Sequence, residues 1–245
     1  MNRTHCFTAL LLLAACSNPG TPTSTSEDIP AAGQEPLLQN ARTYHPLNLP
    51  NLDDNVRNDT LLIYTTHALG NGEFVMAARN VEETREGLRL YLYKPRADSS
   101  ADVLAVSKPA YDSEVMLPTY FSTGDTADGT IILANYGGLE SWGQNVFWLK
   151  NGHFRDLGWL DVAERTFKVR MDSLQQWRTT IAPLTHVNGA NGQFDFTFQG
   201  DSLMIYDDLQ GGREVMLPTS RIRYRYDGRS MVLLVDGKPR TPAPL

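Results

Sequence analysis

The sequence predicts a mainly β protein, built as a single β-sandwich, barrel or partial-propeller-like domain. From residue 57 onward, short apolar or alternating segments recur between clusters of Gly, Asn and Asp, as expected for strands joined by turns. An Asn-Gly pair and an Asp-Gly pair directly follow apolar runs, which is typical of hairpins. Many short strands with little helix favour a sandwich or a barrel.

The periodicity places strands at 61–64, 74–78, 88–93, 103–106, 115–117, 130–134, 146–149, 154–160, 194–198, 203–206, 222–226 and 231–235. At most one short helix is expected, within residues 161–177, because 173–177 contains good helix formers. The folded part is long enough to bury a sizeable core, and no second linker divides it.

Two turns are specified clearly. Asn151-Gly152 lies between apolar runs and predicts a two-residue hairpin turn, because both residues accept a positive φ. The pairs expected across this hairpin are Lys150 with His153, Trp148 with Arg155, and Val146 with Leu157. Trp148 and Arg155 would then share a face and form a cation-π contact.

A second hairpin is predicted at Asp236-Gly237, after the apolar run at 231–235. We expect Pro239 and Pro242 to leave the C-terminal segment unpaired, because proline cannot donate to a strand ladder.

One six-residue segment, Glu-Val-Met-Leu-Pro-Thr, occurs at 114–119 and again at 214–219. Each copy follows a predicted strand and precedes an Asp-Gly pair and an apolar run. These ordered matches predict two related β units in which the segment holds equivalent positions, with chance identity as the alternative. The prediction requires that the strands around the two copies pair in the same order.

The N-terminus has the features of a targeting segment. A polar start with one positive charge precedes an apolar run that is too short to span a bilayer. The run ends in Leu13-Ala14-Ala15-Cys16, which resembles the lipobox of bacterial lipoprotein signal peptides. The resemblance implies removal of residues 1–15 and acylation of Cys16, and Ser17 after the cysteine implies the outer membrane. An ordinary secretory signal is the alternative.

Residues 16–56 are predicted to be a lipid-anchored flexible tether, because Ser, Thr, Pro and Asn crowd this segment. Its second part, 44–52, is expected to be extended and to lie against the domain. Residues 57–245 then form the β-rich globular domain. Cys6 and Cys16 are the only cysteines, so a mature chain acylated at Cys16 has no disulfide.

Several short motifs suggest chemistry but have simpler interpretations. Gly200-Asp201-Ser202-Leu203 spells the signature of the GDSL hydrolase family, in which the serine is the nucleophile. In that family a histidine lies downstream of the serine, but no histidine follows His186 here. A serine without a base is not activated, so we interpret the motif as a turn.

No metal site or cofactor is predicted. The segment 125–129 has two acids and a glycine, as a calcium loop has, but it lacks the remaining ligands and is interpreted as a turn. The histidines of the mature chain are not in metal-ligand spacing; they are His45, His67, His153 and His186.

The candidate binding surface combines aromatic and basic residues. Three tryptophans lie close together in the sequence, and three arginines alternate with apolar residues on one strand. The residues concerned are Trp142, Trp148, Trp159, Arg221, Arg223 and Arg225. The alternative for the tryptophans is packing in the core. The alternative for the arginines is a solvated face on which they pair with the protein's own carboxylates.

The net charge of −6 gives the chain no general attraction to nucleic acid. We therefore expect an envelope protein with a membrane anchor, an envelope protein or glycan as partner, and a non-enzymatic binding or structural role. The alternative is a hydrolase or carbohydrate-active enzyme with dispersed carboxylates. A deep pocket with two facing carboxylates would favour the enzyme, and an aromatic patch beside the arginines would favour binding.

Overall fold

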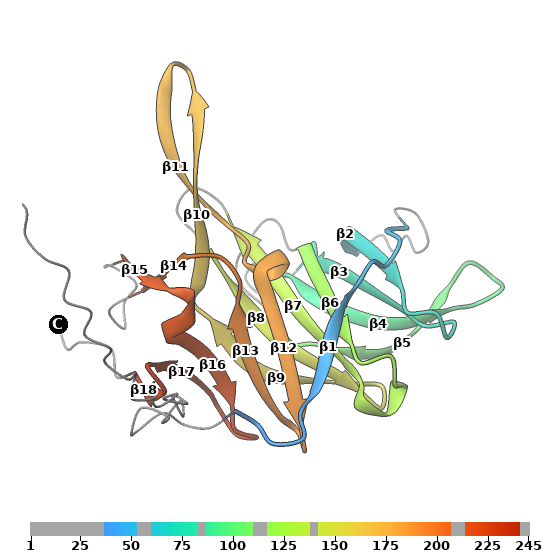
Figure 1. Ribbon diagram of the computed structural model, residues 1–245. Helices are drawn as coiled ribbons and strands as arrows, with labels where there is room; N and C mark the ends of the chain where they lie inside the picture. The colour runs from blue at the N-terminus through green and yellow to red at the C-terminus, as the bar shows by residue number, and fades with distance from the viewer. Residues whose placement is uncertain are drawn as a thin grey trace, which may run out of the picture. The chain divides into compact units, whose positions relative to one another are not determined.

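The computed structural model describes residues 37–52, 60–82, 87–109, 117–137, 142–206 and 214–240, with only the backbone at 136, 137 and 142. The expected signal peptide, Cys16 and most of the expected tether lie outside these residues. The described residues form three antiparallel sheets and short 3-10 helices (Figure 1), so the predicted mainly β fold is confirmed.

The largest sheet contains ten strands. They are β1 (Arg42–Leu47), β6 (Leu117–Ser122), β7 (Thr130–Gly137), β8 (Trp142–Lys150), β9 (His153–Leu160), β12 (Thr185–Ala190), β13 (Gln193–Phe198), β16 (Ile222–Tyr226), β17 (Met231–Val235) and β18 (Lys238–Pro239). Their order across the sheet is β18-β17-β16-β13-β12-β1-β6-β7-β8-β9. Strand β1 therefore lies between the set β12 to β18 and the set β6 to β9.

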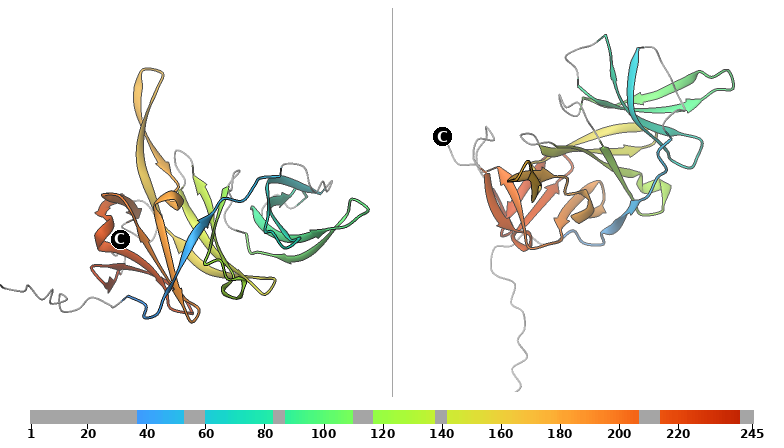
Figure 2. Two further views of the ribbon diagram at one scale, coloured as in Figure 1. Left: turned by 45° about the vertical axis from the view of Figure 1, so that its right-hand side comes forward. Right: turned by 90° about the horizontal axis from the view of Figure 1, so that it is seen from above.

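The ten-stranded sheet curls into a half-barrel (Figure 2). Strand β9 lies at one edge of the sheet and contacts β16 and β17, which lie near the opposite edge. Gly158 is essential to this approach, because its φ is +109° and a Cβ there would lie 2.8 Å from the Cβ of Met231. The curl encloses the main core, which includes Phe121, Ile131 and Phe196.

Strand β1 connects the two sets of strands in the half-barrel. Residues 42–44 pair with β12, whereas residues 45–47 pair with β6. Arg42–Leu47 therefore form a strand of the folded sheet, although they precede the boundary expected at residues 56 and 57. The expectation that 44–52 is extended and lies against the domain agrees with β1 and with the bridge between Asn51 and His67.

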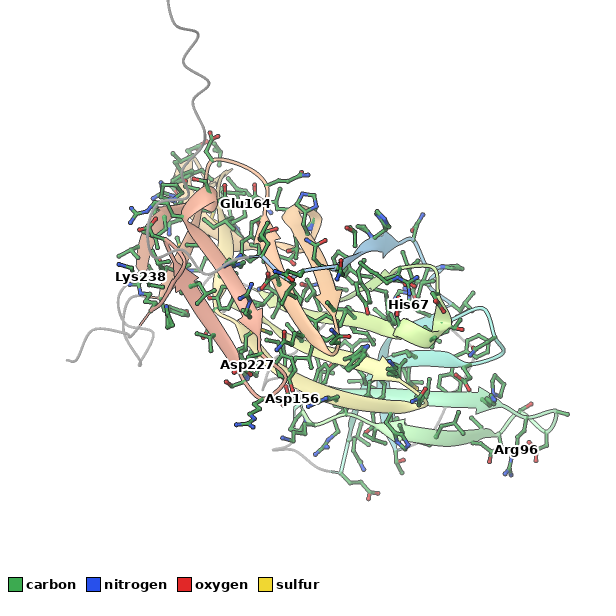
Figure 3. All side chains as sticks on the ribbon, turned by 60° about the horizontal axis from the view of Figure 1, so that its bottom comes forward. His67, Arg96, Asp156, Glu164, Asp227 and Lys238 are labelled. Carbon is green, nitrogen blue, oxygen red and sulfur yellow. The ribbon has the colours of Figure 1, made fainter. Side chains whose placement is uncertain are left out.

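A second sheet packs on the outside of the half-barrel. It is formed by β2 (Leu61–Ala68), β3 (Phe74–Asn80), β4 (Arg89–Pro95) and β5 (Ala101–Val106), in that order. Val75, Leu90 and Leu92 of this sheet pack against Tyr120 and Phe147 of the large sheet. In Figure 3, His67 marks this layer contact, and Arg96 marks the outer end of the β4–β5 hairpin.

The third sheet contains β10 (Val162–Arg170), β11 (Ser173–Thr179), β14 (Ser202–Tyr206) and β15 (Glu214–Pro218), in the order β11-β10-β14-β15. The segment 161–177, where at most one short helix is expected, contains β10 and part of β11 and no helix. Met171 and Asp172 both have positive φ, at 50° and 59°, and form a two-residue hairpin turn. The β-branched and aromatic residues Thr166, Phe167 and Val169 suit a strand, and cross-strand pairing outweighs the weak helical propensity of 173–177.

The predicted hairpins form, with two differences. Lys150 pairs with His153 and Trp148 with Arg155 as expected, but a bulge makes Val146 pair with Gly158 instead of Leu157. At the second hairpin, Asp236 and Gly237 have positive φ as required. Pro239 is nevertheless paired, opposite Leu234. It is tolerated because β18 is the edge strand of the sheet, where a residue without an N–H leaves no ladder hydrogen bond unmade.

The two copies of the repeated segment occupy different structural positions, so the predicted duplication is wrong. The second copy forms β15, which pairs with the preceding strand β14. In the first copy, Leu117 begins β6, which pairs with β7 and β1, while the preceding strand β5 belongs to another sheet. Residues 114–116 lie outside the described residues. The identity of six letters is therefore a coincidence of β-forming residues.

Candidate functional site

A cavity of about 650 Å³ opens at one end of the half-barrel. It lies where β1 begins and where the β8–β9 and β12–β13 turns meet, so its walls come from segments far apart in the sequence. Among its described lining residues are Arg42, Tyr44, Trp148, Lys150 and Arg155.

A single backbone carbonyl holds two aromatic side chains of the cavity in place. The carbonyl oxygen of Asp128 accepts a hydrogen bond from Trp148 Nε1 at 2.7 Å and another from the Tyr44 hydroxyl at 3.2 Å. Asp128 ends the 3-10 helix η1 (Thr126–Asp128), and the next residue, Gly129, has φ 77° and ψ −172°. This backbone conformation is essentially restricted to glycine, so the local sequence fixes where the carbonyl points.

The aromatic rings form one wall, which continues into the core. Phe194 contacts Trp148 edge to face with ring centroids 5.1 Å apart, and contacts Tyr44 in the same way at 5.8 Å. Gly189 lies directly beneath these rings, since a Cβ there would be 2.8 Å from Phe194 and 2.9 Å from Tyr44. Trp148 is only partly buried and Phe194 fully buried, so the indole is the ring that a ligand can reach.

Three cationic side chains line the cavity, and they differ in what balances their charge. Arg42 forms ion pairs with Asp125 at 3.1 Å and with Asp128 at 2.8 Å. Hydrogen bonds from the Ala127 N–H and from Arg42 lower the pKa of Asp125, which is therefore a stable anion. Arg42 is thus neutralised by the protein itself.

Lys150 and Arg155 have no carboxylate within ion-pair distance among the described residues. Lys150 Nζ lies 4.8 Å from the ring centroid of Trp148. The guanidinium of Arg155 lies 5.5 Å from the ring of Tyr226 and donates a hydrogen bond to the carbonyl oxygen of Gly228 at 2.8 Å. The predicted shared face of Trp148 and Arg155 is therefore correct, but the cation that lies over the indole is Lys150.

The cavity thus has a positive charge that its own carboxylate does not balance. Asp128 is the acidic residue among its described lining residues, and its carboxylate is paired with Arg42. The two facing carboxylates that the hydrolase alternative requires are not present among those residues. Chemically, the arrangement can hold an anion beside an indole ring.

The structure separates the residues of the candidate binding surface. Trp148 lines the cavity, Trp159 lies on β9 outside the described lining, and the side chain of Trp142 is not among the described parts. Arg225 binds the carboxylate of buried Asp195 through two hydrogen bonds of 2.7 Å, and Arg223 approaches the same carboxylate at 3.8 Å.

Arg221 forms an exposed ion pair with Asp236. All three arginines of the candidate surface therefore contact the protein's own carboxylates, but only Arg221 lies on a solvated face, because the side chains of Arg223 and Arg225 are 12% and 13% exposed. Arg223 and Arg225 also point to the face of β16 opposite the core residues Tyr224 and Tyr226.

The other motifs behave as turns. Ser202 is exposed at the start of β14, and Gly200 before it has a φ of +89°. The Asp125 carboxylate caps η1 by accepting the Ala127 N–H, so the acids of 125–129 serve the turn and Arg42. No group of three or more metal-ligating side chains occurs among the described residues.

Sequence reasoning missed Arg42, Tyr44, Asp128 and Lys150 as site residues. Lys150 had one local signal, since it precedes the Asn-Gly turn two positions after Trp148 and thus shares its face. Arg42 and Tyr44 had none, because a segment crowded with polar residues and proline does not indicate a central strand.

No family model matches this sequence, and no curated protein or solved structure shows a significant match. In the part of the chain that the structure describes, no helix is long and apolar enough to cross a membrane.

Proposed function

We propose that this chain is a lipid-anchored envelope protein whose half-barrel binds an acidic sugar unit of a glycan, without catalysing a reaction on it. The observation that carries the proposal is the pair of cations, Lys150 and Arg155, which have no carboxylate partner in the described residues and line a cavity beside Trp148.

The size of the cavity suits this ligand. A volume of about 650 Å³ lies within the range of small-molecule sites, which is about 300–1,000 Å³. One or two sugar rings fill such a space, whereas a folded protein partner would need a larger and flatter surface.

The side chains supply both parts of the recognition. The partly buried indole of Trp148 lines the cavity beside Lys150 as an apolar contact for a sugar ring, and it is held in one orientation by its hydrogen bond to Asp128. Lys150 and Arg155 supply charge-assisted donors for a carboxylate on that ring. Because Arg42 is already occupied by two carboxylates, it contributes mainly to the shape of the site.

The envelope location rests on the lipobox resemblance. Acylation of Cys16 would attach the chain to a membrane, and Ser17 supports the outer membrane as its destination. Replacing Cys16→Ser should abolish labelling with radioactive palmitate and release the protein from the membrane fraction. Continued labelling of the variant would contradict the anchor, without bearing on the cavity.

Binding can be tested with two sugars that differ only at C6, where glucuronate has a carboxylate and glucose a hydroxymethyl group. We expect calorimetric titration of the purified protein to detect glucuronate and to show much weaker or no binding of glucose. Lys150→Met and Arg155→Gln should each weaken glucuronate binding about tenfold or more, since a hydrogen bond to a charged group contributes about 1.5–3 kcal/mol.

Arg221→Gln is the matched control, because it removes an exposed arginine that lies outside the described lining of the cavity. It should leave binding unchanged. Equal binding of glucose and glucuronate, or equal loss in the control variant, would overturn the proposal. Release of a cleaved product from an acidic oligosaccharide would support the hydrolase alternative instead.

A further inference from the structure

The β10–β11 hairpin extends beyond the body of its sheet (Figure 1). Its base is fixed by Arg178, whose Nε donates to the Glu214 carboxylate on β15 at 2.7 Å. From residue 164 to residue 180, no residue is buried. A hairpin that is stabilised only by its own ladder has little reason to carry large apolar side chains unless they meet a partner.

Large apolar side chains nevertheless gather at its free end. We call Phe167, Val169, Met171 and Leu174 the distal apolar patch. Their exposed fractions are 53%, 75%, 90% and 68%, so Met171 at the turn is the most exposed large apolar side chain in the described part of the chain. Val169 pairs with Leu174 across the hairpin, and Phe167 lies two positions before Val169, so these three share one face.

Basic side chains lie directly behind the patch. Lys168 and Arg170 point to the opposite face of β10, next to the turn. Lys168 Nζ lies 4.7 Å from the ring of Trp177, and Arg165 lies 5.5 Å from the ring of Phe167. Basic residues therefore concentrate here in a chain whose net charge is −6.

We propose that the distal apolar patch inserts into the head-group region of a membrane that contains anionic phospholipids. The order of side chains along the hairpin matches the layers of a bilayer surface. Apolar residues at the tip enter the boundary of the acyl chains, the adjacent cations meet lipid phosphates, and Trp177 lies further back at the level of the interface.

The bilayer suits this hairpin better than a protein groove does. Attraction to anionic lipid explains why cations lie beside the apolar residues on both faces of this hairpin, although the protein as a whole is acidic. A protein groove would contact only one face of the hairpin. The proposal rests on the proposed acylation only in that the acyl groups bring the domain to a membrane. The hairpin would then give the tethered domain a fixed orientation.

A fluorescent label at the tip tests the insertion. The chain has no cysteine after Cys16, so Met171→Cys introduces a single labelling site in the acylated protein. We expect an environment-sensitive dye at this position to be quenched by nitroxide lipids in vesicles of phosphatidylcholine with phosphatidylglycerol. Ser99→Cys is the matched control, since Ser99 is also an exposed turn residue with positive φ, on another hairpin.

The expected result is quenching at position 171 that clearly exceeds quenching at position 99 and declines in vesicles of phosphatidylcholine alone. Adding Arg170→Gln should lower the ratio of inserted to free hairpins about fivefold, the effect of one basic residue at an anionic surface. Equal quenching at 171 and 99, or protection of the label only after envelope proteins are added, would overturn the proposal.

The mass of the N-terminal peptide reports acylation independently of the dye. A chain without acyl groups can be labelled at position 171 alone once Cys6→Ser and Cys16→Ser are added, and it can be mixed with the same vesicles. A missing anchor and a hairpin that does not insert are therefore distinguished.

Discussion

Replacing Gly129→Ala should destabilise the protein and disturb Trp148 together. Gly129 is buried, with φ 77° and ψ −172°, and a Cβ there would lie 2.5 Å from the carbonyl oxygen of Leu149 and 2.8 Å from Trp148 Nε1. The backbone conformation costs alanine about 1–3 kcal/mol. The contact with Leu149 adds about 1–3 kcal/mol, because a paired strand backbone cannot move aside easily.

The middle of the two ranges gives a total of about 4 kcal/mol, which corresponds to a fall in Tm of about 8–16 °C for a protein of this size. Differential scanning calorimetry measures the fall, and the tryptophan emission spectrum reports the lost hydrogen bond of Trp148. Gly124→Ala is the matched control in the same loop, because Gly124 also has a positive φ, at 86°, but no atom lies within 4 Å of its Cβ position. It should lower Tm by about 2–4 °C. Equal shifts for the two variants would refute the steric argument.

Three further outcomes follow from the structure. Asp195→Asn should lower the free energy of unfolding, measured in urea, by about 3–5 kcal/mol, since Asp195 is buried between Arg223 and Arg225. Asp236→Asn, at the exposed pair with Arg221, should lower it by less than about 1 kcal/mol. Similar losses in the two variants would contradict the role of burial. Burial raises the pKa of Tyr44 to about 12, above the unfolded value of about 10, so the folded state keeps a proton that the unfolded chain loses. The free energy of unfolding should therefore fall between about pH 10 and 12, and Tyr44→Phe should make that fall shallower. Ser202→Ala should leave any esterase activity of the purified protein unchanged, and complete loss would restore the hydrolase interpretation of the Gly-Asp-Ser-Leu motif.

Most strands were predictable because their residues bury side chains in a regular pattern. In β7, Ile131 and Leu133 face the main core while Ile132 and Ala134 face the second core, which explains the uninterrupted apolar run. The β10–β11 hairpin was not predictable in the same way. It buries nothing beyond its base, so it carries no period-2 burial signal, and only the positive φ at Met171 and Asp172 reveals its turn.

The candidate site was less predictable than the fold, because its parts meet only through tertiary structure. Trp148 and its position opposite Arg155 followed from the Asn-Gly turn. The partners that fix the indole are the Asp128 carbonyl, 20 positions earlier, and the Phe194 ring, which comes from β13. Local patterns cannot specify such contacts, and the arginines of β16, which had a clear pattern, balance Asp195 instead.

Strand β1 lies between the cavity and the segment that carries the proposed N-terminal anchor. Arg42 and Tyr44 line the cavity, and the next residues of the same strand pair with β6, so β1 holds the two sets of strands in the half-barrel together. Asn40, just before β1, also lines the cavity, which means that the chain enters the folded domain at the rim of the proposed binding site. A pull on the proposed tether would therefore act first on Arg42 and Tyr44. The backbone pairing of β1 and the contacts of these two side chains with Asp125, Asp128 and Phe194 would resist it, so the proposed binding and the proposed attachment would depend on the same short strand.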